Sequence, residues 1–430
     1  DCSKLTSIDI SHFNMENVID MDLMFESCSS LKTIDFSNLN APNLKSMRST
    51  FSNCYSVTSF NFMNFNARNV TDMSNMFYFC KSLTFIDLLS IHIEKVIDMS
   101  NMFQYCHSLT SINISNFNVP SLSNINNMFD NCINLISINF SNFNGKNLTS
   151  MNYLFKYCNS LNSVDFSNFN SPNLKNMIGV FYYCNQLESI NLNNFNSQNV
   201  NDMSYLFYSC SSLENINLSS LNVQNVKTMS YMFYNCDSLK SIDLTSFNTK
   251  NLVNMTHMFD YCKSLTSADL SNLQNPQLKY IDYMFRNCYS LKIINFNNFN
   301  TQKLESMDAL FKNCSSLPYV DFKSFNTQYL KNISSLFENC LSLTSVDLSN
   351  FKSQKIRRIN NIFYTCPNLS YIDISSFNLK ESTYLVFNKI IGSEGILKIH
   401  EKLEEQIKEQ IHNIPVFNPS FDPSGTIRLK

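Results

Sequence analysis

The chain has 430 residues and a formal net charge of -2, and 15% of its residues are charged, against a typical value of about 25%. Glycine occurs only 5 times and tryptophan is absent. So few glycines exclude an ordinary set of phosphate loops, dinucleotide-binding turns and nucleophile elbows. The near-neutral charge gives no electrostatic footprint for a nucleic acid or an anionic membrane.

The cysteines divide the chain into equal 26-residue repeats. All 15 cysteines, from Cys2, Cys28 and Cys54 to Cys366, are evenly spaced, without insertion or deletion. Each repeat reads approximately C-x-S-L-x-S-I-D-L-S-N-F-N-x-x-N-V-x-x-M-x-x-M-F-x-x. A period of this length is typical of solenoids, in which each coil contacts only its neighbours, so residues 1–378 predict about fifteen stacked coils. Because the M-x-x-M-F half that would precede Cys2 is missing and no polar cap is visible there, we expect a fragment or a processed form.

A short strand is predicted near the start of each repeat. Leu stands three residues after the cysteine, as at Leu31, with Val57 the only exception, and apolar residues stand at six and eight, as at Ile34 and Phe36. The residue between the last two is always Asp or Asn, from Asp9 to Asp373. This alternation predicts a strand with one buried face, and stacked coils would place equivalent strands about 4.8 Å apart in a long curved parallel sheet.

The second half of each repeat predicts a short helical turn. The apolar residues of one helical face in the first repeat are Val18, Met21, Met24 and Phe25. Asn17 stands where an N-cap would, and Asp20 follows three residues later, as in a capping box. The expected fold class is α/β, a right-handed solenoid of leucine-rich-repeat type with a long curved parallel sheet and one short helical turn per coil.

Aromatic and cysteine columns are expected in the core. Phe stands three residues before the cysteine from Phe25 to Phe363, and a second aromatic column runs through Phe13, Phe65, Phe117 and Phe143. We expect two continuous buried spines. The cysteines are expected to be buried, reduced thiols, because parallel Cβ atoms about 4.8 Å apart exceed the separation of roughly 3.5–4.5 Å in a disulfide. A zinc site is not expected, since no paired ligands converge.

Two long runs carry a family resemblance. MSNMFYFCKSLTFIDL (73–88) and MSYMFYNCDSLKSIDLTSFNTKNL (229–252) resemble the BspA-type leucine-rich repeat, the 26-residue repeat of bacterial and protist surface proteins. The resemblance covers residues 2–378. It implies a non-enzymatic protein at the cell surface or secreted, used in adhesion or ligand binding, and it supplies no catalytic, cofactor or metal residues.

The repeat breaks after Asn378. Residues 379–412 predict a degenerate last repeat and a strand-helix C-terminal cap, whose helix has Leu403, Ile407 and Ile411 on one face. A helix that binds a partner is the alternative. Residues 413–430 contain three prolines and predict an extended, loosely ordered tail.

Polar columns allow structural and functional interpretations. The Asp/Asn column of the strands is expected on the concave sheet face, where it is either a solvated surface or a ligand strip, with a weak cation site between Asp9 and Asp35 as a further option. The Asn columns that include Asn40 and Asn43 are expected to form ladders bonded to neighbouring backbone. A tyrosine stripe that includes Tyr182 is expected to stack along a flank or to contact a glycan or protein.

Departures from the consensus on the strand face are the candidate binding residues. Most coils carry Ser or Thr beside the Asp/Asn position, whereas a few carry apolar, aromatic or basic residues there. The candidates are Met63, Phe85, Asp87, Leu89, Ile293, Tyr319, Lys323 and Tyr371. Apolar residues exposed on a binding surface are typical contact residues. Drift within the repeat family is the alternative interpretation.

No catalytic set is predicted. The 6 histidines occupy unrelated columns, and an open strand face is a poor place to shift a pKa. We expect no cofactor, no nucleic-acid partner and no membrane-spanning segment, since no sufficiently long apolar run occurs. The expected function is a surface or secreted protein that holds a protein or glycan ligand. The alternative is an intracellular scaffold within a larger assembly.

Overall fold

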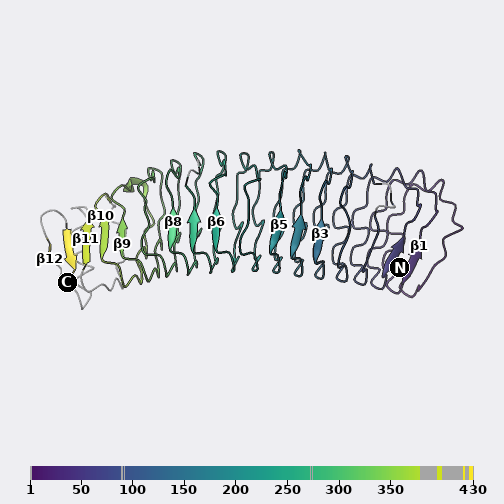
Figure 1. The fold of residues 1–430 in the computed structure, drawn as a ribbon, viewed down its shortest axis with the longest axis horizontal. Coiled ribbons are helices and arrows are strands. Elements are labelled where there is room, and N and C mark those ends of the chain that lie inside the picture. The colour runs from purple at the N-terminus through teal and green to yellow at the C-terminus, as the bar shows by residue number, and fades with distance from the viewer. Residues whose placement is uncertain are drawn as a thin grey trace. The chain divides into compact units, whose positions relative to one another are not determined.

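The computed structural model describes residues 2–88, 91, 93–271, 273, 275–377, 395–399, 420–421 and 426–429. The chain divides into two compact units, Asp1–Val223 and Gln224–Lys430, each considered by itself. In both units, successive coils lie side by side and their strands run in the same direction (Figure 1). No described segment forms a helix of the length and apolarity that crossing a bilayer requires.

The strands pair in parallel, each residue with its equivalent one repeat later, as Thr33 with Ser59 and Ser241 with Ser267. In most of these strands the middle residue is buried and its neighbours are more exposed, as in Thr33–Asp35. The predicted parallel-sheet solenoid is therefore confirmed. The strands of the first unit are β1 (Thr33–Asp35), β2 (Ser59–Asn61), β3 (Ser137–Asn139), β4 (Ser163–Asp165) and β5 (Ser189–Asn191). The second unit contains β6 (Ser241–Asp243), β7 (Ser267–Asp269), β8 (Ile293–Asn295), β9 (Ser345–Asp347), the 3-10 turn η1 (Ser353–Lys355), β10 (Tyr371–Ile374), β11 (Gly395–Ile399), β12 (Ser420–Phe421) and β13 (Thr426–Leu429).

A proline separates two sheet segments of the second unit. The segment β6-β7-β8 ends at β8, and the next segment begins at β9. Around the break, the Lys292 N–H donates to the Thr266 carbonyl and the Thr344 N–H donates to the Pro318 carbonyl, both at 2.9 Å. Pro318 has no N–H with which to donate to the coil before it. Pro318 therefore leaves the ladder between β8 and the next coil without one of its hydrogen bonds.

The last strands close the sheet of the second unit. β10 pairs in parallel with β9 and β11, while β13 pairs antiparallel with β11 and β12. β11 lies in the segment predicted to supply the strand of the C-terminal cap, and the predicted helix that follows lies outside the described residues. β12 and β13 lie in the segment for which the sequence predicts an extended tail.

The predicted helical turn is wrong, because the structure has a series of tight turns in its place. Two residues of this turn series adopt a left-handed conformation in each coil, as do Leu23 (φ 59°) and Ser27 (φ 58°). The Glu26 N–H donates to the Leu23 carbonyl within the coil at 3.0 Å, whereas the Ser27 N–H donates to the Ser52 carbonyl of the next coil at 2.8 Å. In an α-helix every N–H would reach the carbonyl four residues earlier. Left-handed residues and bonds between coils therefore exclude the helix.

The turn series buries the same apolar positions that a helical face would. Met73, Met76 and Phe77 are fully buried, although no helix is present there. Asp20, predicted to belong to a capping box, accepts the Asp22 N–H on Oδ1 at 2.5 Å. This Asp therefore fixes the first turn of the series, and the apolar spacing alone did not distinguish turns from a helix.

Stacked phenylalanine rings fill the core. Phe103 lies between Phe77 and Phe129, with ring centroids 5.3 Å and 5.5 Å away and nearly parallel planes. This spine runs from Phe25 to Phe207 in the first unit and from Phe233 to Phe363 in the second. The second predicted spine is not continuously buried: Phe13 is 45% exposed, whereas Phe65, Phe117 and Phe143 are buried.

The cysteine column is buried beside this spine. Among the cysteines, all of them free, only Cys2 is exposed. The Cys106 thiol donates to the Phe77 carbonyl of the preceding coil at 3.2 Å, and this contact recurs along the chain. Burial raises the pKa of Cys54 to about 12. The buried thiols therefore stay protonated at neutral pH and serve as small groups that also hydrogen-bond between coils.

Candidate binding surface

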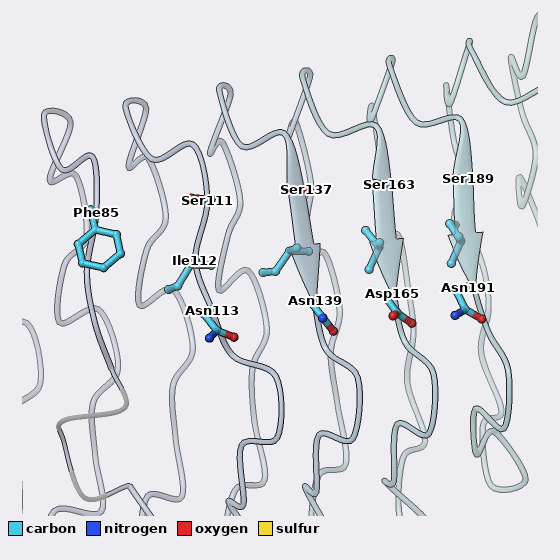
Figure 2. A pocket seen from close by; sticks show the side chains of 13 residues that line it. Phe85, Ser111, Ile112, Asn113, Ser137, Asn139, Ser163, Asp165, Ser189 and Asn191 are labelled. Carbon is cyan, nitrogen blue, oxygen red and sulfur yellow. The ribbon is translucent and has the colours of Figure 1, made fainter.

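The exposed residues of the strands form two columns along each unit. In β4, Ser163 and Asp165 lie on either side of the buried Val164. Figure 2 shows the second column as a row in which Asn113 and Asn139 precede Asp165. The strand face thus presents a hydroxyl group in most coils and a carboxylate or carboxamide group in every coil.

The Asp/Asn column fixes the chain where each strand ends. The Asp35 Oδ1 accepts the Ser37 N–H at 2.7 Å, and the Asp243 Oδ1 accepts the Thr245 hydroxyl and N–H at 2.7 Å and 2.9 Å. The hydrogen bonds from Thr245 lower the pKa of Asp243. An Asn side chain accepts the same bond, which explains why either residue occurs here. Within the part of the chain that the structure describes, no group of three His, Cys, Asp or Glu residues could hold a metal ion.

Asparagine ladders join the coils away from the strand face. The Asn69 Nδ2 donates to the Pro42 carbonyl of the preceding coil at 2.6 Å, which confirms the predicted bonding for this column. The Asn66 Nδ2 donates to the Asn40 Oδ1 at 2.6 Å, so this second column bonds side chain to side chain instead of to backbone. Both columns have a structural role.

A groove of about 630 Å³ lies on the strand face of the first unit. Phe85 stands at one end of it, where its ring is 59% exposed (Figure 2). The rest of the lining consists of the Ser, apolar and Asp/Asn residues of the following coils, from Ser111 to Asn191. These are consensus residues, so a search for departures from the consensus missed them.

A second groove, of about 340 Å³, lies on the strand face of the second unit. Tyr319 and Tyr371 line it from two coils, with Ser345 of the coil between them. Tyr319 is 62% exposed, whereas Tyr371 is half-buried. Asp321, Lys323 and Asp347 contribute charged groups to the lining.

The structure divides the predicted contact residues among several places. Tyr319, Lys323 and Tyr371 line one groove and Phe85 lines the other. The remaining candidates are Met63 and Ile293, which are exposed but line neither groove, Asp87, which is exposed, and Leu89, which lies outside the described residues.

The sequence matches a known protein family along most of its length. It matches the family described as "Mycoplasma protein of unknown function, DUF285" over residues 1–112, 98–212, 176–293 and 279–389. The chain belongs to this family. The matches recur along the 26-residue coils of the DUF285 chain, and the predicted resemblance to BspA-type leucine-rich repeats is confirmed. No curated protein matches the sequence.

Solved structures similar to this DUF285 chain include bacterial leucine-rich repeat proteins. One from Bacteroides ovatus ATCC 8483 has 18% identity over 85% of this chain and 87% of that chain, with a TM-score of 0.46. One from Eubacterium ventriosum ATCC 27560 has 16% identity over 76% and 87%, with a TM-score of 0.36. The functional domain of InlJ from Listeria monocytogenes, described as including a cysteine ladder, has 14% identity over 99% and 84%, with a TM-score of 0.26.

A buried charged cluster on the turn side escaped the sequence analysis. The fully buried Asp260 accepts from the Arg286 Nη2 at 2.7 Å, and its Oδ2 lies 2.8 Å from the His257 Nδ1. The His257 ring stacks between Tyr231 and Tyr283, with centroids 4.4 Å and 4.6 Å away. The sequence signal is a pair of opposite charges at the same position of successive repeats, which become neighbours on adjacent coils.

The tyrosine stripe also lies on the turn side. Tyr182 and Tyr208 stack with ring centroids 4.6 Å apart, which confirms lateral stacking for this pair. Burial raises the pKa of Tyr182 to about 12. Neither ring lines the two strand-face grooves. The stacked tyrosines of the turn side are therefore separate from the exposed aromatic residues of the strand face.

The two grooves have the chemistry of contact surfaces. Their linings combine hydroxyl, carboxylate, carboxamide and aromatic groups and contain no His or Cys. The family that matches the chain is described as being of unknown function. The leucine-rich-repeat fold and these linings are typical of a binding scaffold.

Proposed function

We propose that this chain is a non-enzymatic surface or secreted protein that holds a protein or glycan ligand on its strand face. The observation that carries the proposal is that each of the two grooves is bordered by an exposed aromatic ring where most coils have Ser. Aromatic rings provide large contact areas on binding surfaces and dominate their energetics. The Ser and Asp/Asn columns supply hydrogen-bond donors and acceptors beside them.

The rigidity of the strand face supports this function. Its backbone is paired from coil to coil, and the Asp/Asn side chains fix each strand end, as Asp35 does. A surface that is ordered before binding loses little conformational entropy when a ligand arrives. A shallow face can then bind through many modest contacts with a few aromatic anchors.

Arrays of glycans and of surface proteins test the proposal with the full chain. Phe85→Ser and Tyr319→Ser restore the usual residue of the repeat, so they should fold. Each substitution is expected to lower the affinity for a ligand bound in its groove by about tenfold. Ile97→Ser and Leu341→Ser are matched controls, since both residues are exposed apolar side chains outside the strand segments. The proposal fails if neither groove variant changes the binding of any ligand, or if the controls weaken binding equally.

The alternative function is an intracellular scaffold within a larger assembly. In such an assembly the coils would stack against partner proteins, and the free thiols would be unremarkable. Protease treatment of intact source cells, followed by mass spectrometry of the released peptides, separates the two. Release of repeat peptides from unbroken cells supports the surface protein. Retention until lysis, in step with an intracellular control protein, supports the scaffold.

A further inference from the structure

The groove between Tyr319 and Tyr371 combines paired rings with carboxylates. We propose that it binds the guanidinium or ammonium group of an Arg or Lys side chain on a protein ligand, held between the two tyrosine rings. This inference rests on the proposed function and names the ligand class of one of its two grooves.

The spacing of the coils suits one cation between the rings. Tyr371 pairs with Ser345 in the parallel ladder. The Thr344 N–H donates to the Pro318 carbonyl, which places the coil of Tyr319 on the other side of Ser345. Strands about 4.8 Å apart put the two tyrosine positions about 9.6 Å apart. A cation above Ser345 would then lie about 4.8 Å from each ring, within the distance of about 6 Å at which a ring face attracts it.

The charges of the groove favour a cation. Asp321 and Asp347 supply two carboxylates and Lys323 one ammonium group, which leaves the lining with one net negative charge. The Asp321 Oδ1 accepts the Lys323 N–H at 2.9 Å, so this carboxylate is held at the strand end. A neutral sugar ring would use the tyrosine faces but would gain nothing from the net charge.

One ring is also held in place by the chain itself. The Tyr371 hydroxyl donates to the Asp373 Oδ2 at 3.2 Å, and this carboxylate is buried. The bond fixes the direction of the Tyr371 ring before any ligand binds. A pre-oriented ring face loses less entropy on binding a cation than a freely rotating one.

The same chain already holds cations against paired rings elsewhere. The Arg286 guanidinium lies 5.6 Å from the Tyr261 centroid and 4.8 Å from the Tyr283 centroid, while it binds the Asp260 carboxylate. The Lys156 ammonium lies similarly over two tyrosine rings. At these sites the cation comes from the chain. In the groove a small serine side chain lies between the rings, which leaves space for a cation from a ligand.

Saturation-transfer NMR on the full chain tests the proposal with a defined probe. The probe is N-acetyl-arginine N-methylamide, and its citrulline analogue is the neutral control of the same shape. We expect saturable binding of the arginine probe, and about threefold to tenfold weaker binding of the citrulline probe. Tyr319→Ser should weaken binding of the arginine probe by about the same factor. Lys323→Ser should strengthen this binding, because it removes a competing cation. Ile293→Ser, at the same position one coil earlier, should change nothing.

Three results would overturn the cation site: no saturable binding of the arginine probe, equal binding of both probes, or no effect of Tyr319→Ser. A glycan ligand whose binding is lost in Tyr319→Ser while the arginine probe fails would also overturn it, yet it would support the proposed function. If the arrays give no ligand sensitive to Phe85→Ser or Tyr319→Ser, the proposed function fails as well.

Discussion

Asp130 and Asp260 occupy the same position in their coils, two residues before a cysteine, and both are buried. Their partners differ. Asp260 is paired with the Arg286 guanidinium, whereas Asp130 accepts hydrogen bonds from the neutral amides of Gln104 and Asn131, both at 2.7 Å. A buried carboxylate with a direct cationic partner and one without it respond differently to neutralisation.

Asp260→Asn is expected to lower the free energy of unfolding by about 3 kcal/mol, because the partly buried Arg286 loses its carboxylate. Asp237→Asn is the control, since its pair with Lys263 is more than one-third exposed on both sides and contributes less than about 1 kcal/mol. Urea unfolding followed by circular dichroism measures both. Equal losses in the two variants would contradict the distinction.

The folding stability of the Asp130→Asn variant, relative to that of the wild type, is expected to increase as the pH rises. Burial raises the pKa of Asp130 above the ordinary 3.8, so the folded chain holds this proton more tightly than the unfolded chain does. The contribution to stability is present below the unfolded value and is lost as the pH rises through the raised folded value. Tm values measured from about pH 3.5 to pH 7 should therefore fall for the wild type relative to the variant. A relative fall of the variant would contradict this sign.

At the scale of one coil, the strand was predictable and the turn series was not. The alternation of polar and apolar residues around Ile34 predicts a strand, and the structure has one there with the same alternation of exposed and buried side chains. Left-handed positions argue against a helix, but here they carry mixed residues such as Leu23, Asn75 and Tyr153, and glycine only at Gly179. Because neither left-handed position of the turn series is a column of Gly or Asn, the sequence did not reveal these turns, and the apolar spacing matches a helical face equally well.

Phe103→Ala is expected to lower the free energy of unfolding, measured in urea, by about 3–5 kcal/mol. The substitution removes a fully buried ring that stacks on Phe77 and Phe129. Coils depend mainly on their neighbours, so hydrogen exchange should increase first in the adjacent coils. Phe85→Ser, which replaces an exposed ring, should change stability by less than about 0.5 kcal/mol. A loss below about 1 kcal/mol for Phe103→Ala would show that the ring is not part of the core.

The cysteine column predicts a simple labelling result. In the native chain only Cys2 should react quickly with a thiol reagent at neutral pH, because it is the one exposed cysteine. Burial raises the pKa of Cys366 to about 12 and keeps thiolate rare in the core. All 15 thiols should react after unfolding. Rapid labelling of several thiols in the native chain would contradict the buried column.

At the scale of each unit, the constant repeat length determines which residues become neighbours. It places Asp22 beside Arg48 and Lys312 beside Glu338, in ion pairs of 3.0 Å. The same rule brings the predicted Tyr319 and Tyr371 into one groove. The extent of the first groove was not predictable, because it is built from consensus residues and depends on the three-dimensional form of the coils.

Side-chain footprinting of the full chain, with and without the tightest ligand found on the arrays, tests the location of binding most directly. We expect the ligand to protect strand-face residues, Phe85 in one groove or Tyr319 and Tyr371 in the other, while Tyr182 and Tyr208 on the turn side stay unchanged. Protection confined to the turn-side tyrosines, with both grooves still accessible, would contradict binding on the strand face.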